Sequence, residues 1–308
     1  MHDVSIVIPT FRRPHLLRQT VISCLNQKNS LKLDYQIVVV DNSPEKSAQA
    51  DVEKMTRESS VPISYISEPV QNISLARNAG IARSNARFVA FIDDDEQAAF
   101  EWLDNLVTTQ RIYEADAVFG PVRPVFERGA PPKWDPNALY YTRDRKVPTG
   151  SHIRHGSTSN VLGKVESCFS ENECFDPEFG LLGGEDFVFF MRLSKRGCKL
   201  VWCAEAEVTE FVPESRCDVM YMLRRALRNG QIFVRYSVGN SDRPALTAAY
   251  WMFVGLAQIA VFVIPCSILA FSSLPLAVRA KVKFVGAIGK ISWMKIFEYQ
   301  FYRSRLNK

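Results

Sequence analysis

The first 120 residues alternate short apolar runs with stretches in which apolar residues recur every three or four positions. A continuous apolar run of this length predicts a strand buried on both faces, and the three-to-four spacing predicts an amphipathic helix. Strands joined by helices through short links are typical of a mostly parallel sheet flanked by helices. We therefore predict an α/β fold with a doubly wound sheet, whose strands include Val4–Ile8, Tyr35–Val40, Pro62–Ile66 and Phe88–Ile92.

The helices between these strands carry local markers of their own. The first is expected over residues 16–25, and others over Ser74–Ser84 and Phe100–Tyr113. Ser43 followed by Pro44 predicts a further helix start, because serine caps a helix and proline suits its first position.

Four acids follow the last of these strands: Phe88–Ile92 runs directly into Asp93, Asp94, Asp95 and Glu96. Unpaired charges are too costly to follow the strand into the core. They are therefore expected at the carboxyl end of the sheet, where open α/β sheets bind ligands. Carboxylates held there suit a hard divalent cation that also contacts a phosphate. The alternative is an acidic turn before the next helix, where acids favour the positive helix end.

A second acidic pair, Glu185 and Asp186, comes directly after Gly183 and Gly184. The glycines permit an unusual backbone turn, and a helix is expected to begin at the acids. Asp186 is then a candidate general base held on a stiff turn. The alternative is two acids favoured by the positive end of a helix.

The stretch 121–159 predicts little regular structure, since it contains six prolines and seven Lys or Arg against three acids. Loops of this length are usually functional or disordered. We expect either a basic lid or acceptor contact near the acidic site, or a solvated excursion.

The C-terminal part of the chain is first apolar and then basic. No charged residue lies between Pro244 and Val278, and Ala248–Phe271 is nearly all apolar. This run exceeds the roughly 20 residues that span a bilayer as a helix. The tail Leu276–Lys290 predicts a basic amphipathic helix on anionic lipid. Basic residues flank the apolar run on both sides, so a re-entrant or half-buried anchor stays open beside a spanning helix.

Charge and cysteine usage limit the possible partners and the compartment. The formal charge is +5, but residues from Ser272 onward carry +7 and the preceding ones −2, which does not suit a nucleic-acid-binding body. The seven cysteines form no metal-ligand spacing, so a reducing, cytoplasmic compartment is expected.

Val4–Pro9 is too short for a signal peptide. No G-x-G-x-x-G follows the first strand and no Walker sequence occurs, which disfavours nicotinamide dehydrogenases and P-loop enzymes.

Taken together, these stretches resemble glycosyltransferase family 2, whose members have the GT-A fold and transfer a sugar from a nucleotide with inversion. The resemblance extends from about Val4 to Gly230 and looks closest to bacterial exopolysaccharide glucosyltransferases of the succinoglycan type. It depends on five motifs in order: Val-Ser-Ile-Val-Ile-Pro-Thr-Phe-Arg-Arg (4–13), Val-Val-Val-Asp-Asn-Ser (38–43), Asn72 with Leu-Ala-Arg-Asn-Ala-Gly (75–80), Phe-Ile-Asp-Asp-Asp-Glu (91–96) and Gly-Gly-Glu-Asp (183–186).

The resemblance implies a role for each residue that matches a motif. Asp186 would be the catalytic base, with Glu185 beside it touching the acceptor, and Asp95 would bind Mg²⁺ or Mn²⁺. Many relatives place a metal-binding histidine where this chain has Glu210, and a carboxylate can also ligate a hard cation. The nucleotide-sugar would be held by Pro9, Thr10, Phe11, Arg13, Asp41, Asn72, Arg77, Asp93 and Asp94. Contacts to acceptor or phosphate are expected from Gly184, Arg225 and Arg228, although the two arginines also suit a solvated helix face or a lipid headgroup contact.

The resemblance also implies the partners. The donor would be a UDP-sugar, taken as UDP-glucose, and the acceptor a lipid-linked oligosaccharide or a saccharide. No tryptophan follows the arginines at 224–230, so one sugar per encounter is expected rather than processive synthesis. The enzyme would act at the inner face of the cytoplasmic membrane, with its catalytic domain facing the cytoplasm.

We expect two domains: a transferase domain over 1–243, with a nucleotide-sugar half at 1–120 and an acceptor half at 121–243, and a membrane-anchoring segment over 244–308. Two other classes remain open: a sugar nucleotidyltransferase, and a non-catalytic membrane-bound assembly factor that binds nucleotide-sugars. The transferase hypothesis requires that Asp95 and Asp186, 91 positions apart, belong to one site.

Overall fold

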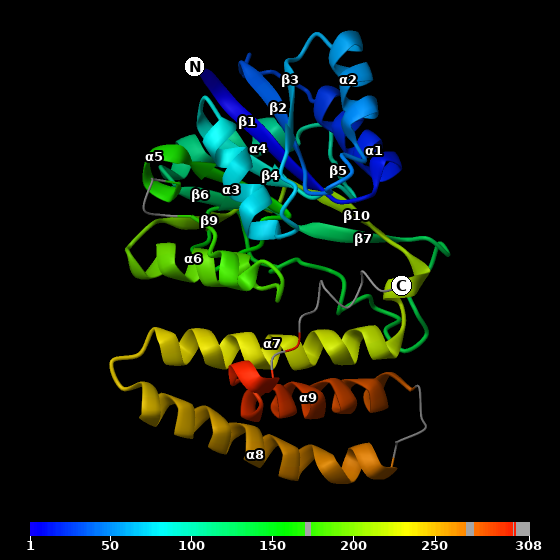
Figure 1. Ribbon diagram of the computed structural model, residues 1–308, viewed down its shortest axis with the longest axis vertical. Coiled ribbons are helices and arrows are strands. Elements are labelled where there is room, and N and C mark those ends of the chain that lie inside the picture. The colour runs from blue at the N-terminus through cyan, green and yellow to red at the C-terminus, as the bar shows by residue number, and fades with distance from the viewer. Residues whose placement is uncertain (170–173, 269–273, 298, 300–308) are drawn as a thin grey trace. The chain divides into compact units, whose positions relative to one another are not determined.

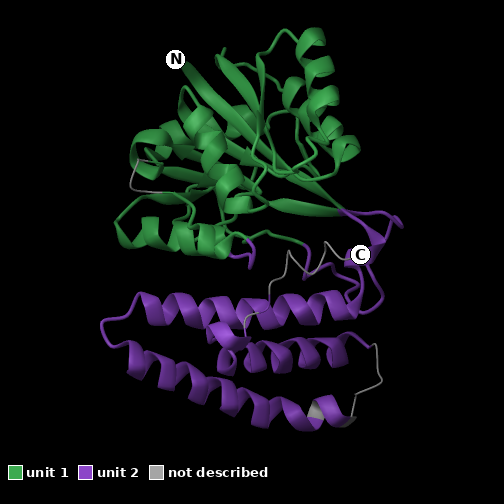
Figure 2. Ribbon diagram, viewed as in Figure 1, with its two compact units in different colours: residues 1–124, 142–180, 185–211 green, residues 125–141, 181–184, 212–308 purple. Residues whose placement is uncertain are grey.

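A computed structural model describes the chain except for residues 170–173, 269–273, 298 and 300–308. The chain forms two compact units. Figure 2 shows unit 1, which consists of 1–124, 142–180 and 185–211, and unit 2, which consists of 125–141, 181–184 and 212–308.

Unit 1 is built on a seven-stranded sheet with the order β3-β2-β1-β4-β8-β6-β9 (Figure 1). The first four of these strands pair in parallel, whereas β8 runs antiparallel to both β4 and β6. The predicted α/β fold with a mostly parallel, helix-flanked sheet is therefore confirmed. The strands are β1 (His2–Thr10), β2 (Tyr35–Asp41), β3 (Ile63–Ser67), β4 (Ala86–Ile92), β6 (Ala117–Phe119), β8 (Asn160–Lys164) and β9 (Leu200–Trp202).

Helices cover both faces of this sheet, because its central strands are apolar on both sides. In β1, Ile6 and Ile8 point into one core cluster and Val7 into the other. Helices α1 (Pro14–Leu25), α2 (Gln49–Glu58) and α4 (Trp102–Tyr113) pack on the first face. Helices α3 (Ile73–Arg83), α5 (Val165–Cys168) and α6 (Glu185–Lys195) pack on the second.

A smaller sheet has the order β5-β10-β7, and its strand β5 begins at Glu96, the last of the four acids that follow β4. Its strands are β5 (Glu96–Ala98), β10 (Val208–Val212) and β7 (Val122–Phe126). In the antiparallel β5–β10 pair, Glu210 lies directly opposite Glu96. The segment 121–159 is therefore not wholly irregular, since it contributes β7 and two isolated bridges.

The helix start predicted at Ser43–Pro44 is wrong, because α2 begins at Gln49. Side chains hold the intervening residues in turns: Asp41 accepts hydrogen bonds from the backbone of Ser43 and Ala48, and Ser43 Oγ accepts one from Ser47 N. Serine and aspartate compete with helix formation in this way when they bond to nearby backbone groups.

Unit 2 contains three long helices, α7 (Val219–Gly239), α8 (Pro244–Ile268) and α9 (Pro275–Ile291), with short 3₁₀ turns at Glu214–Arg216 and Lys295–Phe297. Helix α7 extends well beyond the predicted Asp218–Arg228. The tail helix is present as α9, but Val278 on its apolar face is buried in a protein core with Met222 and Trp134, rather than exposed for lipid. Part of the expected lipid-facing surface therefore serves packing within unit 2.

One helix in the described part of the chain, Pro244–Ile264 of α8, is long and apolar enough to cross a membrane by length and composition. Only 6% of the residues in its apolar window are buried inside the protein.

Candidate active site

The acids after β4 form a tight turn at the carboxyl end of the large sheet. Glu96 N donates to the carbonyl of Asp93 at 3.1 Å, and Asp93 N donates to Glu96 Oε2 at 2.9 Å. The turn stops β4 and starts β5, so the side chains of Asp93, Asp94 and Asp95 stand at the edge where ligands of α/β sheets bind.

The loop after β1 encloses Asp94. Thr10 Oγ1 donates to Asp94 Oδ2 at 2.8 Å, and Phe11 N donates to the same oxygen at 3.4 Å. Arg13 Nη1 bridges Asp94, at 3.2 Å, and Asp95, at 3.0 Å. Burial raises the pKa of Asp94 to about 6, although Arg13 opposes this effect. The structure thus brings together five of the residues predicted from sequence at one edge of the sheet.

Arg143 lies on the other side of the acidic turn and was not predicted. Its Nη2 pairs with Glu96 at 2.9 Å and with Glu210 at 3.0 Å. Burial lowers the pKa of Arg143, but Glu210 and Glu96 outweigh burial, and the net pKa is raised. The basic stretch 121–159 therefore supplies a cation to the acidic site. The alternative of a solvated loop does not hold at Arg143.

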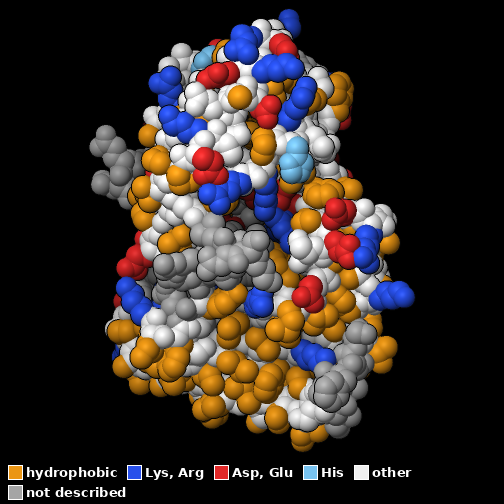
Figure 3. Space-filling model, turned by 45° about the vertical axis from the view of Figure 1, so that its right-hand side comes forward, with side chains coloured by type: hydrophobic (Ala, Val, Ile, Leu, Met, Phe, Trp, Pro, Cys, Tyr) orange, Lys and Arg blue, Asp and Glu red, His pale blue; other side chains and the backbone are white. Residues whose placement is uncertain are grey.

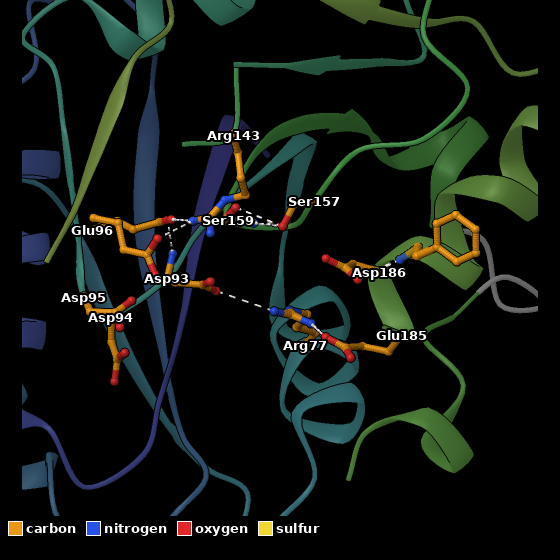
Figure 4. Close-up of polar contacts among 12 residues, drawn as sticks. Arg77, Asp93, Asp94, Asp95, Glu96, Arg143, Ser157, Ser159, Glu185 and Asp186 are labelled. Atoms are coloured by element: carbon orange, nitrogen blue, oxygen red, sulfur yellow. Dashed lines mark hydrogen bonds and ion pairs between the residues drawn. The ribbon is translucent and has the colours of Figure 1, made fainter. Parts of the chain in front are cut away.

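Arg77 of α3 connects the acids of the turn after β4 with those of α6 (Figure 4). It is 4% exposed, and its two terminal nitrogens point in different directions: Nη1 pairs with Glu185, and Nη2 pairs with Asp93 at 3.5 Å. Its guanidinium carbon also lies 5.6 Å from the centre of the Phe175 ring. A single buried side chain thus contacts both acidic clusters, which lie on either side of it.

The turn before α6 has the backbone that its glycines allow, with φ of +84° at Gly183 and +85° at Gly184. Glu185 follows and is buried, and among the described residues its Oε2 has no hydrogen-bond partner. Burial raises the pKa of Glu185; the charge of Arg77 opposes this, and Asp186 adds to it. Asp186 is half-buried and accepts the backbone N–H of Phe187 at 2.7 Å.

A second contribution of the 121–159 stretch is found beside Asp186. The ring of His155 packs edge-on against Phe187, with ring centres 5.4 Å apart. Burial and Arg145 lower the pKa of His155, while Asp186 raises it. Ser157 and Ser159 follow, and their hydroxyls hydrogen-bond to each other at 2.9 Å near Arg143 (Figure 4). A single histidine or serine in a basic loop gave no signal that could have identified these positions from sequence.

Asp41 and Asn72 hold the protein's own loops. Asp41 is fully buried, and its carboxylate accepts four hydrogen bonds, from Ser43 N, Ser43 Oγ, Ala48 N and Tyr65 Oη. Asn72 caps α3 by accepting from Ser74 N and Leu75 N. A donor group of a bound nucleotide can therefore reach Asp41 only if one of these four donors gives way. Pro9 lies inside β1, opposite Val40 of β2.

The remaining predicted residues, Gly184, Arg225 and Arg228, belong to unit 2. Arg225 Nη1 donates to the carbonyl of Tyr140 at 3.2 Å, and Arg228 donates to Asn229 Oδ1. Their contact with acceptor or phosphate stays a prediction.

The acidic turn fits a divalent cation in its chemistry. Asp93, Asp95, Glu96 and Glu210 all act on Arg143 as neighbouring negative charges, and all offer the oxygen ligands that Mg²⁺ prefers. No group of three or more His, Cys, Asp or Glu side chains is arranged to hold a metal ion in the parts of the chain that the structure describes. Mg²⁺ sites in nucleotide enzymes commonly use only one or two carboxylates together with substrate phosphates. Asp95, with or without Glu210, therefore fits a cation that arrives with a diphosphate.

Comparisons with known proteins identify the family of the chain. The family model of glycosyl transferase family 2 matches residues 5–169. The succinoglycan biosynthesis protein ExoM of Rhizobium meliloti is 34% identical over 228 residues, which cover 74% of this chain and 73% of that protein. A second relative, the GalNAc(5)-diNAcBac-PP-undecaprenol beta-1,3-glucosyltransferase of Campylobacter jejuni, is 27% identical over 58% of this chain and 56% of its own length.

Among solved structures, residues 1–349 of TarS from S. aureus, in complex with UDP-GlcNAc, match with a TM-score of 0.56 at 16% identity. The match covers 94% of this chain and 91% of that one, and it supports the fold. The chain belongs to glycosyl transferase family 2 and is a glycosyltransferase of the exopolysaccharide type.

Proposed function

We propose that the enzyme transfers one glucose from UDP-glucose to a lipid-linked saccharide with inversion at the anomeric carbon. The observation that carries the proposal is Arg77, which contacts Glu185 and Asp93 at once. This double contact supports one site for the acids suited to a diphosphate and for Glu185, whose neighbour Asp186 is suited to an acceptor hydroxyl.

The donor would lie along the carboxyl edge of the large sheet. Thr10, Phe11 and Arg13 form the loop nearest to Asp94, and Arg13 and Arg77 offer positive charge to the diphosphate. Asp41 would accept the uracil N3–H after release of one of its present donors. Asp93, which is about one-third exposed, is available to a ribose or sugar hydroxyl.

Asp95 and, as a further ligand, Glu210 would hold Mg²⁺ or Mn²⁺. When bound, a divalent cation neutralises diphosphate oxygens as they gain charge. Asp95 and Glu210 are now paired with Arg13 and Arg143, so these arginines would yield part of their contacts to the ligand.

Asp186 would act as the base. It would remove the proton of the acceptor hydroxyl while that oxygen forms a bond to the anomeric carbon and the bond from that carbon to the UDP oxygen breaks. Glu185 Oε2 is buried and has no hydrogen-bond partner among the described residues. It would accept a hydrogen bond from a neighbouring hydroxyl of the acceptor. Base catalysis of this kind contributes about 10²–10⁴-fold.

The names of the relatives support the choice of acceptor and sugar. ExoM takes part in succinoglycan biosynthesis, and the Campylobacter enzyme transfers glucose to a saccharide on undecaprenol diphosphate. A lipid-linked acceptor also suits the apolar helix α8, and we place the enzyme at the inner face of the cytoplasmic membrane, with unit 1 in the cytoplasm.

The test is a mass-spectrometric screen in which the full-length enzyme receives several UDP-sugars and lipid-linked acceptors. We expect glucose transfer with release of UDP, and a loss of about 10²–10⁴-fold in Asp186→Asn with UDP binding unchanged. Asp51→Asn is the matched control, because Asp51 also lies in a helix first turn but is not one of the residues placed in the site. An Asp186→Asn enzyme that keeps more than a tenth of wild-type turnover would remove Asp186 from the role of base.

A further inference from the structure

Helix α8 exposes an apolar outer face along most of its length. The large side chains on this face are more than half exposed and recur at helical spacing. They are Leu246, Tyr250, Phe253, Leu256, Val261 and Ile264, with exposures of 62, 58, 70, 56, 65 and 65%. Figure 3 shows hydrophobic side chains gathered over the part of the molecule where α8 lies in Figure 1. A continuous patch of this kind marks an interaction site in a soluble protein.

The polar contacts along the middle of α8 are on its inner face, toward α9. Gln258 accepts a hydrogen bond from Lys290 Nζ at 3.0 Å. The same Nζ lies 5.5 Å from the Trp251 ring centre, and Lys283 Nζ lies 5.5 Å from that of Phe262. A helix at the surface of a water-soluble bundle turns its polar face outward. Helix α8 does the opposite, which indicates that its outer face is covered by something apolar.

Helix α8 is bound closely to α9 and therefore does not enter a membrane alone. A Cβ added at Gly255 of α8 would lie 2.9 Å from the Ile291 side chain and 3.1 Å from the Ala287 carbonyl oxygen. Helix α9 is joined to α7 in the same way, since a Cβ at Gly289 would lie 2.2 Å from the carbonyl oxygen of Leu227. The glycines thus allow direct backbone contact at both crossings.

This packing argues against a helix that crosses the bilayer. Contacts from Trp251 to Phe262 place α9 alongside the middle of α8. A crossing α8 would therefore draw α9 into the hydrocarbon together with its cations. Such charges within the bilayer are costly and rare. The cations of α9 are Arg279, Lys281, Lys283 and Lys290.

The charge of this region specifies the partner. Residues 243–297 contain six Lys or Arg and no Asp or Glu. Arg243, directly before α8, and Arg279, in the second turn of α9, are both exposed. An apolar face bordered by cations matches an anionic bilayer surface, where each basic residue near the headgroups adds to the attraction.

We propose that α8 lies in the plane of an anionic bilayer, with its outer face among the headgroups and upper acyl chains, and does not cross the membrane. This proposal extends the membrane location above. It does not depend on the donor or acceptor, because lipid binding is measured without turnover.

The first experiment is sedimentation of the full-length protein with vesicles of phosphatidylcholine that contain 0 or 30% phosphatidylglycerol. We expect binding that increases at least tenfold with the anionic lipid and falls at least tenfold in Phe253→Lys. The matched control is Ile112→Lys, because Ile112 is 67% exposed but belongs to α4 of unit 1, and this variant should bind like wild type. A wild-type protein that pairs with itself and ignores vesicles would overturn the proposal.

The second experiment distinguishes a helix in the plane from one that crosses. Nitroxide labels are attached at Tyr250→Cys and Val261→Cys, in a background without the native cysteines, and their depth in the bilayer is measured by electron paramagnetic resonance. These positions are 11 residues apart on the exposed face, about 16 Å along a helix. We expect both labels at the same depth, about 5–10 Å below the headgroup boundary. A depth difference close to the distance of about 16 Å between the two labels along the helix would show that α8 crosses the membrane, and would overturn the proposal.

Discussion

Arg77 is the residue on which the site depends. It is buried, and it contacts acids from two different elements through the two arms of one guanidinium. Lysine has a single ammonium and cannot reproduce a forked contact. The position therefore requires arginine for geometry as well as for charge.

We expect Arg77→Met to lower the free energy of unfolding by about 3–5 kcal/mol, because removal of one partner leaves Glu185 as an uncompensated buried charge. The double variant Arg77→Met/Glu185→Gln should recover most of that loss, since the charge is then gone, but it should not recover transfer. Denaturant unfolding and a turnover assay measure the two effects. If the double variant regains activity, Arg77 serves stability alone.

Glu185 gives the protein a pH-dependent stability. Its pKa is raised in the folded state by burial, against the charge of Arg77. The folded protein thus binds this proton more tightly than the unfolded chain does. The resulting stability is fully present below the unfolded pKa, near 4.5, and is lost as the pH rises through the folded pKa. We expect a flatter decline of unfolding free energy above pH 4.5 in Glu185→Gln, measured in denaturant between pH 5 and 8. The exposed Glu58→Gln should keep the wild-type slope, and an unchanged slope in Glu185→Gln would contradict the assignment.

At the scale of elements, the small sheet contains an unfavourable pair that the rest of the protein compensates. Glu96 of β5 and Glu210 of β10 lie directly opposite each other, and like charges in such positions destabilise a sheet. Arg143 pairs with both of them. The cation therefore holds two strands together as well as one edge of the site.

We expect Arg143→Gln to lower the free energy of unfolding by about 1–3 kcal/mol, as for a lost charged hydrogen bond in a buried setting. Arg123→Gln is the control, because Arg123 forms its pairs with Glu207 and Asp144 at the surface and should matter by about 1 kcal/mol or less. Equal losses in the two variants, measured by denaturant unfolding, would show that the cross-strand acids need no compensation.

The elements also show what a sequence can predict. Strands β1, β2 and β4 were predicted because each is a continuous apolar run that must be buried. Strand β8 was missed, since Asn-Val-Leu-Gly-Lys is short, contains a glycine and follows a proline-rich stretch. The acids of the site were visible because a charged cluster cannot remain in a core. Arg143 was not, because its role depends on the register of Glu96 against Glu210, which are 114 positions apart in the chain.

At the scale of the whole molecule, each unit has a core of its own. Unit 1 contains the two clusters on either side of the large sheet, and unit 2 contains a separate cluster that includes Phe126, Trp134 and Val278. The candidate donor-binding residues of β1, β4 and their loops all belong to unit 1. A ligand that binds a folded unit and not its unfolded chain stabilises that unit by an amount that grows with the logarithm of the ligand concentration.

We therefore expect calorimetry to show two unfolding transitions, of which UDP with Mn²⁺ shifts only one. At a ligand concentration of 100 Kd the bound unit should gain about 2.7 kcal/mol. A chelator should reduce the shift that UDP causes, and Asp95→Asn should make the chelator irrelevant, because the cation would then have lost its principal ligand. The other transition should respond instead to anionic lipid, since it reports the unit that contains α8. A single transition that moves as a whole with UDP would mean that the two cores unfold together. If a chelator leaves the UDP-induced shift of the wild-type protein unchanged, the cation has no role in donor binding.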